Sequence, residues 1–120
     1  MRILMGKRSI KVRLYDISEA ISGITEALAG CSYEDFSRSW QLQKATERGL
    51  EIISEASRHI PDDLKALAAE VPWHKVAATG NILRHEYQRV EALTIWQIVK
   101  DDLPVLEIGM AKINLAAIDR

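Results

Sequence analysis

Between residues 10 and 28 an apolar side chain recurs every three or four positions. The positions are Ile10, Leu14, Ile17, Ile21, Ile24 and Leu28, spaced 4, 3, 4, 3 and 4 residues apart. With about 3.6 residues per helical turn, this spacing puts all six side chains on one stripe of a helix. Such a stripe must be covered, so the sequence predicts that other helices of a bundle, or a second subunit, pack against it.

Helical patterns continue through the rest of the chain. A second long helix is expected from about Ser39 to His59, a third from Val76 to Gln88, and a last one from near Glu91. Pro104 lies within the last pattern and should kink or restart that helix. Because no segment alternates as a strand does, we predict an all-α fold. It is a single domain over residues 1–120, built as a four- to five-helix up-and-down bundle.

Local signals mark where these helices begin, end and cross. Gly30 is a typical stop for the first helix, and Ser32 can cap a short turn that brings Phe36 inward. Gly49 costs about 1 kcal/mol relative to alanine inside a helix, which a close helix crossing would explain. After Pro61, Asp62-Asp63 can cap a brief helix.

Composition restricts the classes of function. With 48% hydrophobic residues and a formal net charge of -1, the chain can form a core but is not a generally basic nucleic-acid binder. Any RNA contact must therefore be local. The single cysteine, Cys31, excludes an internal disulfide framework. No apolar run is long enough for a signal peptide or a membrane span, so we expect a soluble cytoplasmic protein without a membrane partner.

The third helix carries the densest set of reactive side chains, in Gly80-Asn81-Ile82-Leu83-Arg84-His85-Glu86-Tyr87. Helical periodicity puts Asn81, His85 and Gln88 on one polar stripe, with Arg84 beside it. Histidine can act as a general acid or base near neutral pH, and a guanidinium can hold a phosphate oxygen. These groups suit metal-independent cleavage of a phosphodiester.

The same residues carry a family resemblance. The stretch from Asn81 to Tyr87, preceded by Val71-Pro72-Trp73 and followed by Ile95-Trp96 and Asp101-Asp102-Leu103-Pro104, resembles the HepT-like toxins of the HEPN superfamily. The stretches Tyr15-Asp16-Ile17 and Leu50-Glu51-Ile52-Ile53-Ser54-Glu55-Ala56 are similar to the first- and second-helix patterns of that family. The resemblance therefore covers nearly the whole chain.

The resemblance implies an RNase toxin that needs no cofactor and pairs with an MNT-type nucleotidyltransferase antitoxin, as in a type VII-like toxin–antitoxin system. His85 would be catalytic, with Asn81 orienting the RNA and Glu55 in a supporting role. Tyr87 would be the AMPylation target, the hydroxyl to which the antitoxin attaches a nucleotide. The family also implies a homodimer in which two motif helices build one cleft.

This chain departs from the family at one position. The family motif reads arginine, four residues, histidine, any residue, tyrosine, and the arginine position holds Gly80. Activity could be attenuated or lost, Arg84 could substitute for the arginine, or the glycine could be an inactivating change. If the loss matters, Gly80→Arg should restore cleavage, and fraying around the glycine could also misplace His85.

Simpler interpretations remain beside these. His85 and Arg84 could be solvated helix residues, and Tyr87 an aromatic at the edge of the core. His59 and His74 lack partners at zinc-site spacing, so no metal is expected, and no glycine-rich phosphate loop occurs. Two functions follow: an endoribonuclease, or a catalytically silent dimeric module that binds the antitoxin.

Overall fold

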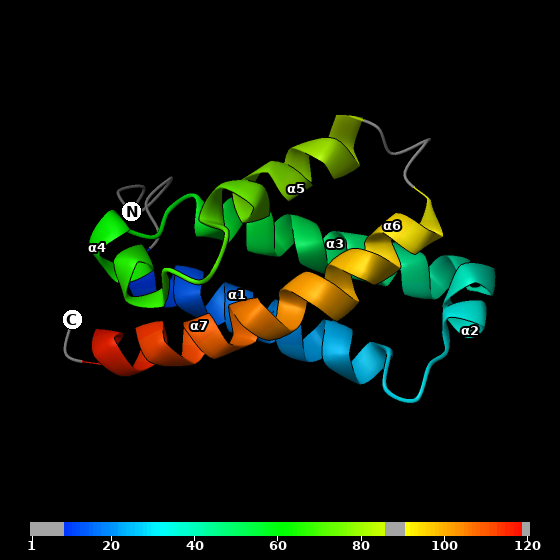
Figure 1. Cartoon of the computed structure of the whole chain (residues 1–120), viewed down its shortest axis with the longest axis horizontal. Helices are drawn as coiled ribbons and strands as arrows, with labels where there is room; N and C mark the ends of the chain where they lie inside the picture. The colour runs from blue at the N-terminus through cyan, green and yellow to red at the C-terminus, as the bar shows by residue number, and fades with distance from the viewer. Residues whose placement is uncertain (1–8, 86–90, 119–120) are drawn as a thin grey trace, which may run out of the picture.

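The computed structural model describes residues 9–85 and 91–118, which are helical apart from the connections between helices (Figure 1). The elements are α1 (Ile10–Ala27), α2 (Tyr33–Arg38), α3 (Trp40–Ser57), α4 (Asp62–Lys65), the 3₁₀-helix η2 (Ala66–Ala68), α5 (Trp73–His85), α6 (Ala92–Gln97), the π-helix η3 (Ile98–Asp102) and α7 (Leu103–Ala117). Across the described ranges, no helix is long and apolar enough to cross a membrane.

The long helical segments run back and forth along the molecule. In Figure 1, α1 and α5 run in one direction, whereas α3 and the joined α6, η3 and α7 return in the other. The short helices α2 and α4 lie at opposite ends, where the chain reverses. The predicted all-α up-and-down bundle is therefore confirmed.

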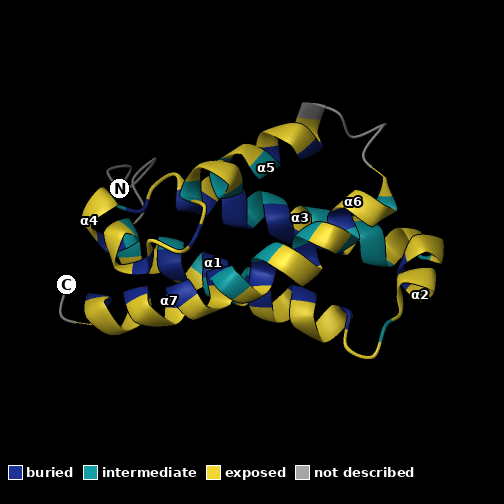
Figure 2. Cartoon of the chain, viewed as in Figure 1, coloured by how far each residue is buried: buried dark blue, intermediate teal, exposed yellow. Residues whose placement is uncertain are grey.

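The apolar stripe of α1 forms the centre of the core. Leu14, Ile17, Ile21 and Ile24 are buried in α1, and Leu28 is buried just after it. The helices that cover this stripe are α3 and α7 of the same chain, and Figure 2 shows the buried faces turned toward one another. Full burial of each such side chain contributes about 1.5–3 kcal/mol, so this stripe alone is a large part of the driving force for folding.

Gly49 marks the close crossing of α3 over α1 that the sequence predicts. A Cβ atom at this position would lie 2.8 Å from both Cγ1 and Cδ1 of Ile24, closer than real Cβ contacts. Because Ile24 is itself buried, a larger residue at position 49 would have to push α1 and α3 apart.

Two helix-end predictions are confirmed and one is corrected. Gly30 has a positive φ of 72°, the conformation in which glycine ends a helix without strain. Ser32 and Asp35 form a reciprocal capping box at the start of α2. The N-cap of α4 is instead Pro61, without a side-chain hydrogen bond. Asp62 and Asp63 therefore do not cap this helix; they occupy its first turn, where carboxylates interact favourably with the helix dipole.

The last helix passes Pro104 through a π-helical turn. The N–H of Leu103 donates to the carbonyl of Ile98, five residues earlier, and α7 then begins with the proline in its first turn. A proline at this place lacks an N–H and crowds the preceding turn. The wider π turn accommodates this defect, so the predicted break takes the form of a local change in helical pitch.

Candidate functional site

The motif helix α5 lies along α3 at one side of the bundle (Figure 1). It begins at Trp73, three residues before the predicted start, and the indole Nε1 donates to the carbonyls of Lys65 and Ala68 at 3.2 Å each. Leu83 is buried against the bundle, whereas Asn81 and Arg84 are exposed. The predicted division of α5 into an apolar and a polar face is confirmed for these residues.

Gly80 is the point of closest approach between α5 and α3. The Ser54 hydroxyl donates to the carbonyl of Ala77 at 2.7 Å and accepts from the N–H of Gly80 at 3.0 Å. Arg58 donates to the same Ala77 carbonyl at 3.0 Å. A Cβ atom at position 80 would lie 2.6 Å from Ser54 Oγ and 2.9 Å from Ser54 Cβ. The serine therefore fills the space that a side chain at position 80 would need.

This packing changes the interpretation of Gly80. The sequence presents it as a missing arginine whose helix could fray, but its backbone N–H is bound and the residue is buried. The Ser54 Oγ could rotate, but Ser54 Cβ is fixed to the α3 backbone. An arginine at position 80 would therefore require α5 and α3 to move apart, or a smaller residue at position 54. Ser54 was missed in the sequence because a lone serine in a helical pattern carries no sign of its partner.

Arg84 folds back over Gly80. Its Nη1 atom would lie 3.4 Å from a Cβ at position 80, and its Nη2 lies 3.5 Å from Asn81 Oδ1. Residues four apart lie on the same helical face, and long side chains of a helix point toward its N-terminus. The absence of a side chain at Gly80 leaves room for this conformation. Arg84 and Asn81 are thus brought together, as the polar stripe predicts.

Beside Arg84 lies a polar groove of about 410 Å³ between α1, α3 and α5. Its lining residues are Arg13, Asp16, Arg48, Glu51, Ile52, Glu55, Ala56 and Arg84. Three arginines from three helices thus face one depression together with three carboxylates, those of Asp16, Glu51 and Glu55, so the formal charges of the groove balance. The periodic pattern within one helix could not reveal this gathering, because it depends on how the helices pack.

Glu55, the residue expected to support the motif, lies in this groove. Its carboxylate is 3.1 Å from His59 Nε2, and this hydrogen bond, assisted by the charges of Arg58 and Arg13, lowers the pKa of Glu55. Because the folded pKa is depressed, the stabilising effect of the carboxylate is present at neutral pH and is lost as the pH falls through the acidic range. Glu55 therefore stays ionised beside the arginines at neutral pH.

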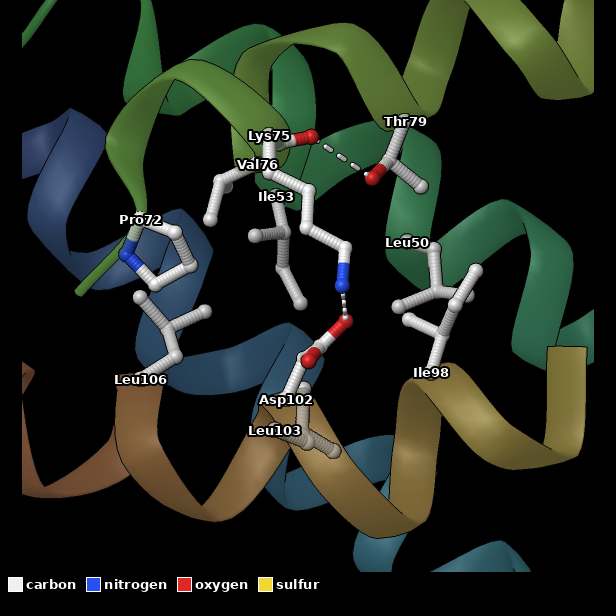
Figure 3. Close-up of a pocket in the computed structure, with 10 residues that line it drawn as sticks. All are labelled: Leu50, Ile53, Pro72, Lys75, Val76, Thr79, Ile98, Asp102, Leu103 and Leu106. Atoms are coloured by element: carbon white, nitrogen blue, oxygen red, sulfur yellow. Dashed lines mark hydrogen bonds and ion pairs between the residues drawn. The ribbon is translucent and has the colours of Figure 1, made fainter.

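The opposite side of α5 contains a second, apolar crevice that is too small for a ligand. Figure 3 shows Leu50, Ile53 and Leu106 around it and the ion pair between Lys75 and Asp102 across it, at 3.0 Å. Its volume of about 30 Å³ is of the order of a single water molecule. The ion pair joins α5 to the π turn, so this crevice belongs to the packing of the motif helix.

Three side chains of the predicted motif helix, those of His85, Tyr87 and Gln88, lie outside what the structure describes. His85 is the last residue of α5, and the structure describes its backbone but not its side chain. Tyr87 and Gln88 lie outside the described residues. The site is therefore defined by Gly80, Asn81, Arg84 and the groove beside them.

Comparison with known proteins assigns the family. Residues 17–113 match the sequence model of the family described as "Ribonuclease HepT-like". The chain belongs to the HepT-like ribonuclease family. It is 44% identical over 108 residues to "Probable ribonuclease HepT" of Thermococcus cleftensis, covering 90% of this chain and 98% of that protein. It is 37% identical over 103 residues to "Putative RNase MJ1380" of Methanocaldococcus jannaschii, covering 86% and 94%. No solved structure matches the chain significantly.

The contact between Gly80 and Ser54 predicts that Gly80→Ala destabilises this HepT-like protein by about 1–3 kcal/mol, because overpacking outweighs the gain of about 1 kcal/mol in helix propensity. Urea unfolding followed by circular dichroism measures the change. The control is Gly23→Ala in α1, where no atom lies within 4 Å of the added Cβ, and it should be neutral or stabilising. In a double-mutant cycle, Ser54→Gly should relieve the cost of Gly80→Ala. Equal effects of Gly80→Ala and Gly23→Ala would contradict the packing argument.

Proposed function

We propose that this chain is a metal-independent endoribonuclease, the toxin subunit of a type VII-like toxin–antitoxin pair, working at a reduced rate. The observation that carries the proposal is the position of the motif. The chain belongs to a ribonuclease family, and the polar residues of its motif helix lie beside a polar groove that contains three arginines and three carboxylates. A single-stranded RNA backbone would follow that groove. Because the net charge of the chain is -1, the attraction for the phosphates would come from the individual arginine side chains.

In this proposal His85 moves the proton. The ribose 2′-hydroxyl loses its proton as its oxygen attacks the adjacent phosphorus, and the 5′-oxygen leaves with a proton. The products are a 2′,3′-cyclic phosphate and a free 5′-hydroxyl. Asn81, exposed on the preceding turn, would orient the RNA through its side-chain amide. Neither step requires a metal or a cofactor.

The reduced rate follows from Gly80. Negative charge gathers on the non-bridging oxygens in the transition state, and a preorganised donor aimed at such charge is worth about 10²–10³-fold in rate. A glycine supplies no cation there. The close packing of Gly80 on Ser54 also supports a second candidate, a catalytically silent dimer that engages the antitoxin. The glycine N–H is hydrogen-bonded to Ser54 and its lack of a side chain is needed for the contact between the helices, so Gly80 has a structural role of its own.

The first test is cleavage of single-stranded RNA by the purified chain in the presence of EDTA. We expect slow cleavage that leaves cyclic phosphate ends, and a further loss of about 10²-fold or more in His85→Ala, because general acid–base catalysis typically supplies that much. His74→Ala is the matched control, since His74 is an exposed histidine of the same helix. Absence of cleavage in the unmodified chain would favour the silent module. Cleavage equal in both variants would remove His85 from the mechanism.

The second test concerns the proposed homodimer. Ala78 and Ile82 lie one helical turn apart on the exposed side of α5, and Ile82 is 49% exposed. If two motif helices face each other across one cleft, light scattering should give twice the 13.5 kDa of one chain, and Ile82→Glu should give a monomer. Leu115→Glu, at a 72% exposed position of α7, is the control and should remain dimeric. Dimer loss in the control alone would exclude this arrangement.

The third test concerns Tyr87 as the modification site. We expect an MNT-type nucleotidyltransferase with ATP to add nucleotide to Tyr87, and Tyr87→Phe to block the addition. Peptide mass spectrometry locates the modified residue. Tyr15 is exposed, but the charge of Glu19 raises the pKa of its hydroxyl, which makes it a poorer source of phenolate. Nucleotide found on Tyr15 or Tyr33 with Tyr87 unmodified would refute the assignment.

A further inference from the structure

Gly80 and Arg84 lie on one face of α5. Gly80 packs its backbone against α3, and Arg84 places its side chain over Gly80. At position 80 the backbone approaches α3 so closely that a Cβ would lie 2.6 Å from Ser54 Oγ. At position 84 the side chain reverses along the helix until its Nη1 comes within 3.4 Å of that same Cβ position. The guanidinium of Arg84 therefore lies over Gly80, about one helical turn closer to the N-terminus of α5 than the Cα atom of Arg84.

The groove beside this point contains two further arginines, and each has a local environment that distinguishes it from Arg84. Arg48 is ion-paired with Glu51 at 3.5 Å, within α3. The Nε atom of Arg13 is buried and has no hydrogen-bond partner among the described residues. Arg84 alone of the three is on the motif helix, adjacent in sequence to His85, and its side chain is exposed.

We propose that Arg84 is the phosphate-binding residue of this chain, held over Gly80 so that its guanidinium takes the place of the arginine that position 80 lacks. The inference rests on the proposed ribonuclease function and names the residue that supports its remaining activity. A planar guanidinium can hold two phosphate oxygens at once, and this geometry stabilises the charge that develops during cleavage. Gly80 contributes by leaving the face open, and Asn81 contributes a contact of 3.5 Å to the same guanidinium.

Arg84 is expected to act in binding as well as in the rate. One phosphate contact contributes a slope of about -0.7 to the logarithmic salt dependence of single-strand binding. Losing the contact should therefore flatten the salt dependence, a change that a purely structural role for Arg84 would not produce. The test uses a 2′-O-methyl RNA oligonucleotide as the probe, because it lacks the attacking hydroxyl and is not cleaved.

The experiment compares Arg84→Ala, Arg84→Lys and Arg38→Ala in the full chain. Arg38 is an exposed arginine at the end of α2, outside the groove, and its loss removes the same charge. We expect Arg84→Ala to lower the cleavage rate by about 10²-fold and to flatten the salt slope by about 0.7, and Arg38→Ala to change neither. Arg84→Lys should keep the slope but recover only part of the rate, because an ammonium cannot bind in a bidentate manner.

The outcomes separate this inference from the proposed function. If the unmodified chain does not cleave RNA, the ribonuclease proposal fails, and the salt slope alone decides the role of Arg84. A flattened slope in Arg84→Ala, with an unchanged slope in Arg38→Ala, supports phosphate binding in either case. If Arg84→Ala matches Arg38→Ala in both slope and rate, Arg84 is a solvated helix residue and the inference is overturned.

Discussion

The contact between α3 and α5 at Ser54 and Gly80 sets the position of everything in the candidate site. The Ser54 hydroxyl joins the Ala77 carbonyl to the Gly80 N–H, so one buried side chain fixes both the separation of the helices and their rotation. Buried hydroxyls are costly unless both their donor and acceptor functions are used, and here both are. Any change at position 54 or 80 would therefore alter the distance of the motif helix from the groove.

A second restraint acts on the other side of the same helix. The π turn before Pro104 carries Asp102, which pairs with Lys75 of α5 at 3.0 Å (Figure 3). The pair spans an apolar crevice that is too small to bind a ligand. Because Lys75 is largely exposed, this ion pair is a weak restraint and adds little to stability.

The positive and negative charges that line the groove balance one another. Three arginines and three carboxylates line it, and the lowered pKa of Glu55 keeps a negative charge beside Arg13. Such a surface does not attract nucleic acid over long distances, because opposite charges screen each other. It does place a carboxylate beside a guanidinium group, as in the pair of Arg48 and Glu51. If the groove binds RNA as proposed, recognition of a short stretch of phosphates would depend on which side chains are preorganised, and the conformation of Arg84 would be decisive.

The helical bundle, the buried stripe of α1, the turn at Gly30 and the close crossing at Gly49 can all be predicted from the sequence, because each depends on short-range periodicity or on one residue's backbone preference. It also identified the residues of the motif. The packing role of Gly80 became visible in the folded chain alone, because its partner Ser54 lies 26 residues earlier and no local pattern connects them. The gathering of Arg13, Arg48 and Arg84 likewise depends on three helices meeting. Contacts between helices are set by the packing of whole faces, which a one-dimensional period does not specify.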